Sequence, residues 1–562
     1  MRKHWNFPTH PDAQLVASIQ HDLGIPAFLA AMLVNRGFNA TAQAEAYMTP
    51  RLRSLTAPEC LPDMSAAVTR LTLALQRNER IVIYGDYDVD GVTSLAILTR
   101  FLQAYGADPA CFLPHRVDEG YGLSEQGIAR CITEHDPRLL IAVDCGTNSI
   151  NEIAALRKRG VDVIVLDHHE PGSVRPDCIA LVNPKCGDSL HYLCSAGVVF
   201  KLAHAMLKAS PVDDLDLRDL LDFVALATVA DIVPLIGENR ILVRHGLRQM
   251  EHTRWPGLRA LQDIAGIGSP IRSSDIGFRM GPRINAAGRL GAANEALSLL
   301  LTDDALEAHR IASGLDARNR ERQSVEKNVV RDAENWVSKH FDPNSQTSIV
   351  AGSRDWHVGV IGVVAARLMR QYHRPTFVIG FDAEGAGKGS GRSIEGLSLV
   401  SLLNDCAEHL EKFGGHDMAA GITISESRLE AFREAFESAS RSIATADMLI
   451  PKLDLDCEVP LDDVGAPLLE TLAQLEPFGN SNARPLMVSR GVAPSSAPRV
   501  MKEKHLRLEF GSGRHRVSAV FFNAPVENMP RPPWDIAYTL DWNTWQGRSE
   551  PQLQIVEVRS AA

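Results

Sequence analysis

The stretch YGDYDVDG at residues 84–91 follows the apolar run at 81–83 and carries three aspartates, Asp86, Asp88 and Asp90. Side chains in an extended backbone repeat with a period of two, so all three carboxylates can project from one side where the predicted strand ends. Three anions this close repel one another unless cations lie among them. Oxygen-preferring ions such as Mg²⁺ or Mn²⁺ are the natural candidates.

Other apolar runs also end in potential ligands. The runs at 139–143, 161–166 and 223–230 are followed by Asp144, by Asp167, His168 and His169, and by Asp231. A lone DxDxD is commonly an acidic loop, and a lone pair of histidines is usually surface or core. Ligands in an open parallel sheet bind beyond the carboxyl ends of the strands, so we expect these groups to converge on one crevice. The pattern therefore favours a site for two ions.

The periodicity predicts an α/β fold with several domains. Residues 1–75 are expected to form a helical lead-in. From 76 to 302, apolar runs alternate with helical patterns, which predicts right-handed βαβ units and a parallel sheet. Residues 303–344 are rich in charge and lack proline up to 340, which predicts a long connecting helix with one solvated face.

The region 345–445 is expected to form a second α/β domain. It contains two glycine-dense segments, GAGKGSGRS at 385–393 and FGGHDMAAG at 413–421. Glycine tolerates positive φ and carries no Cβ, so such segments let backbone amides approach an anion closely, although they also suit plain flexible turns. Arg392 and His416 are suitable polar partners for a phosphate.

Beyond residue 446, short alternating segments at 506–510, 515–522 and 551–558 predict a small antiparallel β-barrel of the OB type. Such barrels bind single strands through a basic groove and aromatic stacking. The candidate groove residues are Lys502, Lys504, Arg507, Arg514 and Arg516. The candidate stacking residues are Phe521, Trp542 and Trp545, although aromatic side chains in small barrels more often belong to the core.

Composition sets limits on the function. The chain has 562 residues and a net charge of −11, which at first sight opposes a nucleic-acid partner. Metal-bound aspartates would account for part of this charge, so basic residues must be concentrated. Two arginine groups are candidates: Arg279, Arg283 and Arg289 around GPRINAAGRL, and Arg318, Arg320 and Arg322, which also suit a solvated helix face.

Several other classes of protein are not indicated. Neither a membrane-length apolar run nor a secretion signal is present, so we expect a cytoplasmic protein. Nine cysteines without a CxxC pair indicate reduced thiols. A zinc site is a weak alternative because its ligands are loosely spaced: Cys178, Cys186, His191 and Cys194. The chain contains no GxSxG or Walker A sequence, so neither acyl transfer nor ATP hydrolysis has a visible site.

The motifs together resemble those of the DHH phosphoesterases. The matching segments are GDYDVDG (85–91), RVDEGYG (116–122), VDCGTNS (143–149), LDHH (166–169), VNP (182–184), SAGVVFK (195–201), ATVADIVPL (227–235), RINAAGRL (283–290), SGRS (390–393) and FGGHDMAAG (413–421). Their order and spacing, more than any single motif, carry the resemblance. It covers most of the chain and implies a DHH catalytic domain followed by a phosphate-binding domain of the DHHA1 type.

The resemblance implies roles for individual residues. The expected metal ligands are Asp88, Asp90, Asp144, His168 and Asp231, with Asp86 in the same cluster and Asp144 bridging two ions. His169 is expected to contact the scissile phosphate and Asp167 to orient imidazole. The implied phosphate or DNA contacts are Arg116, Arg283, Asn285, Arg289, Ser390, Arg392, Gly415 and His416. Many family members have histidine in the first motif where this chain has aspartate, which suits Mg²⁺ or Mn²⁺ better than a softer metal.

Within this family the chain is most similar to the branch of single-strand-specific DNA exonucleases. That similarity implies 5′ to 3′ hydrolysis of single-stranded DNA by two metal ions, in DNA repair and recombination. It implies a monomer whose partners include a single-stranded-DNA-binding protein and a RecQ-type helicase. Two alternatives remain: a phosphodiesterase for short oligonucleotides or cyclic dinucleotides, and a non-enzymatic scaffold. Small relatives of the first kind lack the barrel and lead-in, and scaffolds typically lose the metal ligands.

Overall fold

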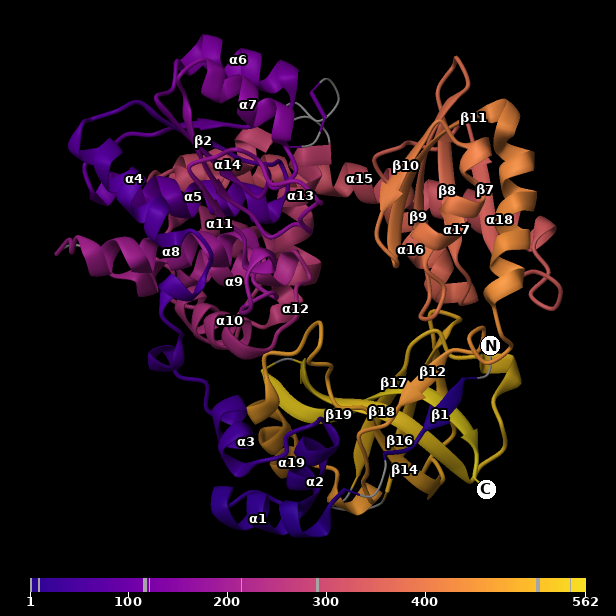
Figure 1. Cartoon of the computed structure of the whole chain (residues 1–562). Helices are drawn as coiled ribbons and strands as arrows, with labels where there is room; N and C mark the ends of the chain where they lie inside the picture. The colour runs from indigo at the N-terminus through magenta and orange to yellow at the C-terminus, as the bar shows by residue number, and fades with distance from the viewer. Residues whose placement is uncertain are drawn as a thin grey trace. The chain divides into compact units, whose positions relative to one another are not determined.

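The computed structural model describes residues 3–8, 11–114, 119–120, 122–213, 215–289, 293–511, 516–545 and 547–561. The chain forms two compact units (Figure 1). One comprises Met1–Asn6 and Ala317–Leu453, and the other comprises Phe7–Asp316 and Asp454–Ala562. The long helix α15 (Ala305–His340) continues from the larger unit into the smaller one, as the charge pattern predicted. No helix in the described part of the chain is both long and apolar enough to cross a membrane.

A five-stranded parallel sheet lies at the centre of the catalytic part of the larger unit, which confirms the predicted α/β fold. Its strands, in the order β3-β2-β4-β5-β6, are β3 (Ala110–Phe112), β2 (Ile81–Tyr84), β4 (Leu139–Val143), β5 (Asp162–Leu166) and β6 (Ala180–Val182). The chain runs outward from β2 to β3 and then returns to the other side of β2 with β4. The boundary between β2 and β4 is therefore the topological switch point, where sheets of this kind bind ligands.

Helices cover both faces of this sheet (Figure 1). They are α4 (Met64–Gln76), α5 (Val89–Ala104), α6 (Glu125–His135), α7 (Ile150–Lys158) and α8 (Ser195–Ala209). Ile83 and Ile141 pack into the core that contains α4, α5 and α8, whereas their neighbours Val82 and Leu140 pack into the core that contains α6 and α7. Burial on both faces explains why the strands are apolar along almost their whole length.

A group of helices completes the catalytic part. Its members are α9 (Leu221–Ala230), α10 (Gly237–Met250), α11 (Pro256–Ala265), α12 (Ser273–Asp275), the π-helical turn Ile276–Met280, α13 (Gly281–Arg289) and α14 (Ala293–Leu301). Helices α9 and α10 pack closely because Gly246 lacks a side chain: a Cβ there would lie 2.1 Å from the backbone oxygen of Leu221. This contact fixes α9, whose end carries Asp231.

The C-terminal part of the larger unit is a seven-stranded sheet. Its order is β13 (Cys457–Glu458), β14 (Met487–Val492), β18 (Trp534–Trp545), β19 (Arg548–Ser560), β17 (Val517–Phe521), β16 (His505–Phe510) and β15 (Arg499–Met501). It differs from the expected antiparallel barrel in two respects. No pairing closes β13 onto β15, which form the two edges of the sheet among the described strands. Strands β17 and β19 run parallel, because β18 reverses the chain between them.

The N-terminal helices pack on this C-terminal sheet. They are α1 (Ala13–Leu23), α2 (Ala27–Asn35) and α3 (Thr41–Met48), and they share one core with the sheet and with α19 (Ala466–Leu472). Leu29 and Leu33 of α2 belong to this core together with Leu469. Arg36 forms a partly buried ion pair with Asp456 at 2.9 Å. Helices α1–α3, which lie within the expected lead-in, therefore pack against the C-terminal part of the chain.

The smaller unit contains a mixed sheet of order β10-β11-β9-β8-β7. The strands are β7 (Ile349–Ser353), β8 (Thr376–Phe381), β9 (Ala386–Arg392), β10 (Lys412–Gly415) and β11 (Ala419–Ser425). Helices α17 (Leu399–Asp405) and α18 (Leu429–Ile443) pack on one face around Phe377, and α16 (Ile361–Tyr372) packs on the other around Val378. A separate strand pair, β1 (His4–Asn6) with β12 (Lys452–Asp454), also lies in this unit.

Candidate metal centre

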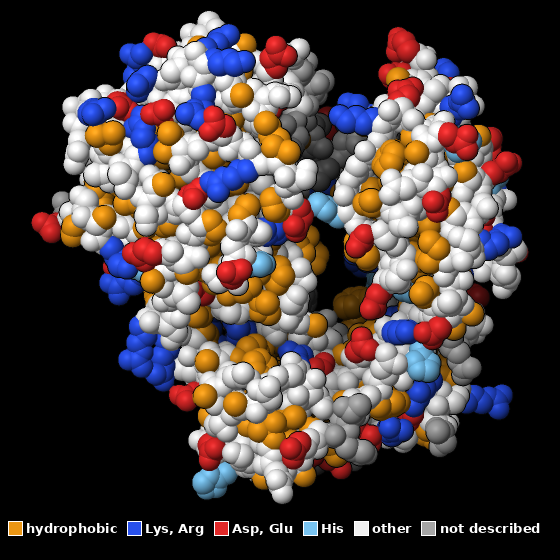
Figure 2. All heavy atoms as spheres, viewed as in Figure 1, with side chains coloured by type: hydrophobic (Ala, Val, Ile, Leu, Met, Phe, Trp, Pro, Cys, Tyr) orange, Lys and Arg blue, Asp and Glu red, His pale blue; other side chains and the backbone are white. Residues whose placement is uncertain are grey.

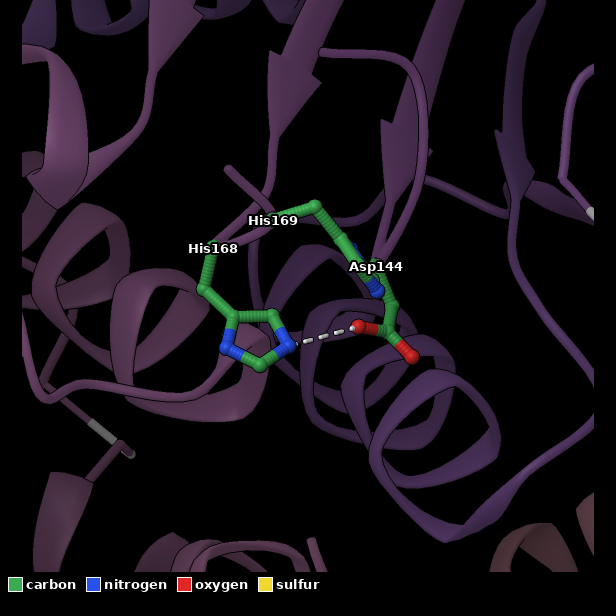
Figure 3. Close-up of side chains that lie close together, drawn as sticks. All are labelled: Asp144, His168 and His169. Carbon is green, nitrogen blue, oxygen red and sulfur yellow. Dashed lines mark ion pairs between the residues drawn. The ribbon is translucent and has the colours of Figure 1, made fainter. Parts of the chain in front are cut away.

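The predicted ligands meet at the carboxyl ends of the parallel strands, on both sides of the switch point. Asp86 follows β2, Asp144 follows β4 and His168 follows β5. Asp90 lies in the first turn of α5, and Asp231 caps the C-terminal end of α9. Figure 3 shows the His168 ring and the Asp144 carboxylate directed toward one another.

His168 lies at the centre of the cluster. Its Nε2 atom is 3.4 Å from Oδ1 of Asp144, 3.6 Å from Oδ2 of Asp231 and 3.8 Å from Oδ2 of Asp90. Three sets of ligand atoms lie within 4.8 Å of one another: Asp144, His168 and His169; Asp90, His168 and Asp231; and Asp86, Asp88 and Asp144. Asp144 and His168 each belong to two sets, so the arrangement suits more than one cation.

The protonation behaviour of the cluster fits divalent cations. Burial and the charge of Asp88 raise the pKa of Asp90 to about 6, and burial and the charge of Asp90 raise the pKa of Asp231 to about 9. Burial also raises the pKa of Asp144 well above its usual value. In contrast, burial lowers the pKa of His168 to about 4, so its imidazole is neutral and able to bind a metal. Cations would relieve the repulsion that raises the carboxyl pKa values.

Asp167 organises the segment that carries both histidines. Its Oδ1 accepts hydrogen bonds from the backbone N–H of His168 at 2.7 Å and from Nδ1 of His169 at 2.7 Å, and its Oδ2 accepts from the backbone N–H of Thr147 at 3.0 Å. Burial alone would raise the pKa of Asp167, but the hydrogen bond from His169 holds it below its usual value. The imidazole that Asp167 orients is therefore that of His169.

The N-terminus of α8 holds two of the aspartates, which the sequence analysis did not foresee. The backbone N–H groups of Ser195 and Ala196 donate to Oδ2 and Oδ1 of Asp90 at 2.7 and 2.9 Å. The hydroxyl of Ser195 donates to Oδ1 of Asp144 at 3.0 Å. The only local signal was a serine at the start of a helical pattern, a position where free N–H groups attract anions.

Two glycines allow helices to approach the loop at 85–88, which carries Asp86 and Asp88. A Cβ at Gly91 would lie 2.5 Å from the backbone oxygen of Asp86, and a Cβ at Gly288 would lie 2.5 Å from that of Tyr87. The second contact brings α13 against the loop. Asn285, a predicted DNA contact, lies on α13 and is half-buried.

Three of the candidate arginines form ion pairs with carboxylates. Arg283 is ion-paired with Asp316 at 2.9 Å, Arg279 with Asp275 at 3.1 Å and Arg322 with Glu326 at 2.9 Å. Arg116 lies outside the described residues, and the side chain of Arg289 is also not among those described. The loosely spaced zinc candidates form no ligand cluster within the described part of the chain, and all nine cysteines are free.

The smaller unit brings the predicted phosphate-binding residues next to one another. On β9, Nη1 of Arg392 donates to Oγ of Ser390 at 3.1 Å. The first turn of α16 is adjacent, since a Cβ at Gly362 would lie 3.1 Å from Oγ of Ser390 and 3.3 Å from Nη2 of Arg392. Arg392 pairs in register with Ala419, whose oxygen accepts the backbone N–H of His416 at 2.8 Å. Gly415, directly before His416, has a φ of 145°.

Arg392 has the surroundings expected of a residue that binds an anion. Burial lowers the pKa of its guanidinium, and no ion pair to a carboxylate is found for it among the described residues. A half-buried guanidinium needs a counter-charge, which a phosphate would provide.

The C-terminal sheet exposes part of its predicted nucleic-acid surface. Lys502, Lys504, Arg507 and Arg516 are exposed, whereas Arg514 lies outside the described residues. Phe521 is buried in the core, so its prediction as a stacking platform is wrong. Its neighbour Phe522 is exposed instead, because it lies directly beyond the last residue of β17 (Val517–Phe521). Trp542 is half-buried, and the side chain of Trp545 is not described.

Models of three known domains match this chain. They are the DHH family N-terminal domain at residues 80–228, the DHHA1 domain at 345–442 and the RecJ OB domain at 455–557. The match over the C-terminal sheet supports an OB domain there, although its barrel is open.

Curated relatives that carry the name single-stranded-DNA-specific exonuclease RecJ match most of this chain. The protein from Bacillus subtilis is 34% identical over 97% of this chain and 69% of its own length. The protein from Dickeya dadantii is 33% identical over 94% of this chain and 96% of its own length.

Solved structures of RecJ from Thermus thermophilus have the same fold. The complex with Mn²⁺ superposes with a TM-score of 0.86 and 31% identity, covering 100% of this chain and 80% of that chain. The complex with Mg²⁺ superposes with a TM-score of 0.79 and 28% identity, covering 100% and 79%.

Proposed function

We propose, on the premise that this chain belongs to the RecJ family of DHH phosphoesterases, that it is a metal-dependent exonuclease specific for single-stranded DNA. Its cofactors are divalent cations, Mg²⁺ or Mn²⁺. The observation that carries the proposal is the convergence of Asp90, Asp144 and Asp231 on Nε2 of His168. Bound cations supply Lewis-acid chemistry, which offsets the charge of the phosphodiester and acidifies water.

The protein's own residues prepare this chemistry. Asp144 belongs to two ligand sets, so its carboxylate would help to hold each of two ions. Asp167 accepts a hydrogen bond from Nδ1 of His169, so Nε2 is the ring nitrogen that would face a phosphate oxygen. Burial alone would lower the pKa of His169, but the hydrogen bond to Asp167 and its charge raise it, which favours the protonated ring that can donate to an anion.

We assign the polarity, 5′ to 3′, to the cluster in the smaller unit. Ser390, Arg392, Gly415 and His416 offer donors and a close backbone approach to a phosphate monoester, which carries more charge than a diester. Arg392→Ala is expected to reduce the preference for a 5′-phosphorylated end over a 5′-hydroxyl end about tenfold. Lys388→Ala is the matched control, because it removes an exposed cation from the same strand without touching Ser390. An unchanged preference in Arg392→Ala would refute the assignment.

One assay tests the activity itself. End-labelled single-stranded DNA, its duplex counterpart and a dinucleotide are each incubated with Mg²⁺ or Mn²⁺. We expect mononucleotides from the single strand alone, and none with Asp144→Ala. Preferential hydrolysis of the dinucleotide would favour the short-oligonucleotide alternative. Absence of hydrolysis of every substrate would favour the scaffold.

The proposed cellular role is DNA repair and recombination in the cytoplasm. We include a single-stranded-DNA-binding protein and a RecQ-type helicase as partners, because both would supply the unpaired strand that this enzyme consumes. Nine free cysteines are compatible with a reducing compartment. Copurification of either partner with the full chain tests this part of the proposal.

A further inference from the structure

A groove of about 390 Å³ lies beside the metal centre in the larger unit. It is formed by the loop after α9, by the segment 272–278 and by the loop 476–484, and its apolar lining includes Leu247 and Phe478. In Figure 2 hydrophobic side chains reach the surface where the catalytic helices meet the C-terminal sheet. The volume falls in the range of sites that hold small organic groups.

Ile232 connects this groove to the metal centre. It directly follows the ligand Asp231 and has a φ of 59°, which is rare and strained for a β-branched residue. Its side chain is nevertheless 70% exposed and lines the groove. Strain of this kind persists only where surrounding contacts impose it. Here Nδ2 of Asn480 donates to the backbone oxygen of Ile232 at 2.6 Å, and Leu235 N–H donates to the oxygen of Asn480 at 2.8 Å.

Phe278 forms the other apolar edge of the groove. It lies on the π-helical turn Ile276–Met280 and is 80% exposed, so Phe278 and Ile232 are two exposed apolar side chains that line the same groove. The turn is anchored because Oγ of Ser273 donates a hydrogen bond to the backbone oxygen of Phe478. Hydrogen bonds therefore anchor the backbone at or next to both apolar edges.

The charges of the groove favour an uncharged aromatic ligand over a phosphate. Two arginines line it, but both are paired with one carboxylate: Arg272 lies 2.5 Å and Arg484 2.7 Å from the oxygens of Asp541. Glu476, which also lines the groove, supplies the second negative charge. The guanidinium of Arg484 also stacks 5.3 Å from the Phe478 ring centre. The lining of the groove therefore presents flat side chains, and its positive and negative charges balance.

We propose that this groove holds a nucleobase of the substrate strand, next to the scissile phosphate, with Phe278 and Ile232 as its stacking edges. The inference rests on the proposed function, because it takes single-stranded DNA as the substrate. The chain continuity from Asp231 to Ile232 places one edge of the groove next to a metal ligand. Every unpaired base has a π-face, so stacking here would fix the strand without selecting a sequence. A duplex would not offer a free base.

The test compares intact oligonucleotides with ones that lack a base. Fluorescence anisotropy measures binding of 5′-phosphorylated single strands in Mn²⁺ on the cleavage-deficient Asp144→Asn background. The strands carry all their bases or an abasic residue at the first or second position. We expect the Asp144→Asn protein to bind one abasic strand about tenfold more weakly than the intact strand. Adding Phe278→Ala should weaken binding of the intact strand about tenfold and abolish this difference.

Two variants serve as controls. Phe278→Trp should keep the sensitivity to base removal, because indole also stacks. Leu306→Ala removes an apolar side chain that is 83% exposed elsewhere in the larger unit and should change nothing. Equal sensitivity to base removal with and without Phe278 would overturn the inference. This binding readout is separate from hydrolysis. A parent protein that hydrolyses no substrate but whose Asp144→Asn variant still binds the intact strand more tightly than an abasic one would contradict the proposed function and support the inference.

Discussion

Ser195 donates a hydrogen bond from its hydroxyl to Oδ1 of Asp144 across 3.0 Å, and both side chains are buried. The same oxygen of Asp144 lies 3.4 Å from Nε2 of His168. Ser195 therefore fixes the orientation of the carboxylate that faces the imidazole. Groups that orient metal ligands in this way commonly tune metal affinity by one to two orders of magnitude.

Ser195→Ala is expected to weaken Mn²⁺ binding about tenfold or more, because the Asp144 carboxylate loses its fixed orientation. Calorimetric titration of the metal-free protein measures the effect. Ser94→Ala is the matched control, since Ser94 is also buried in this domain and its hydroxyl has no hydrogen-bond partner within the described part of the chain. If both variants bind Mn²⁺ equally well, Ser195 does not position the ligand.

Metal binding should become tighter as the pH rises from 6 to 8. Carboxylates must lose their protons to bind a cation, and the pKa values of Asp90 and Asp231 are raised to about 6 and about 9. Mn²⁺ therefore competes with protons more strongly at pH 6. Titrations in two buffers of different ionisation enthalpy would detect the proton release. A dissociation constant that does not change with pH would contradict the raised pKa values.

Asp222 should make stability decrease with pH. Burial raises its pKa to about 7 although it accepts hydrogen bonds from Oγ1 of Thr253 and from the backbone N–H of Phe223. The folded state therefore holds this proton more tightly than the unfolded state, whose pKa is near 3.8. The free energy of unfolding should fall between about pH 4 and pH 7, by up to about 1.4 kcal/mol per pH unit.

Asp222→Asn removes this titration, so urea unfolding of the variant should lose less stability than the parent between pH 5 and pH 8. Other titrating groups are common to both proteins and cancel in the comparison. Parallel stability curves for the two proteins would show that Asp222 ionises normally in the fold.

Lys201→Met is expected to destabilise the larger unit by about 3–5 kcal/mol. Nζ of Lys201 lies 2.5 Å from Oε2 of Glu238, and both side chains are buried. The substitution would leave the Glu238 carboxylate without its counter-charge. Thr56 would also lose an interaction, because its backbone oxygen accepts from Nζ of Lys201 at 2.9 Å.

The double variant Lys201→Met with Glu238→Gln should recover part of that loss, since the unpaired buried charge is then absent. Thermal unfolding of the parent, of Lys201→Met, of Glu238→Gln and of the double variant measures the coupling. Strictly additive effects would mean that the ion pair does not act as a unit.

The metal centre could be predicted from the sequence because its ligands follow strands. Asp86, Asp144 and His168 each end an apolar run, and parallel strands bring their carboxyl ends to one edge. The support from α8 could not be predicted in the same way. The contact of Ser195 with Asp144 joins segments whose separation is set by helix packing, and no local periodicity records it.

The C-terminal sheet has features that could not be predicted from the sequence. Alternation identified β16, β17 and β19, but the choice between Phe521 and Phe522 as the exposed ring depends on where β17 ends. The packing of α1–α3 on this sheet could also not be predicted from local sequence patterns. Those helices have apolar faces that any sheet or helix could cover, and only the folded chain selects the partner.

That shared core has a consequence for the order in which the protein folds during synthesis. Leu29 and Leu33 emerge from the ribosome early, but Leu469, in the same core, is made more than four hundred residues later. At about 5–20 residues per second, these N-terminal helices wait roughly 20–90 s for their partner. Their apolar faces are exposed throughout that interval, so the nascent chain is most prone to aggregate before Leu469 and the C-terminal sheet have been made.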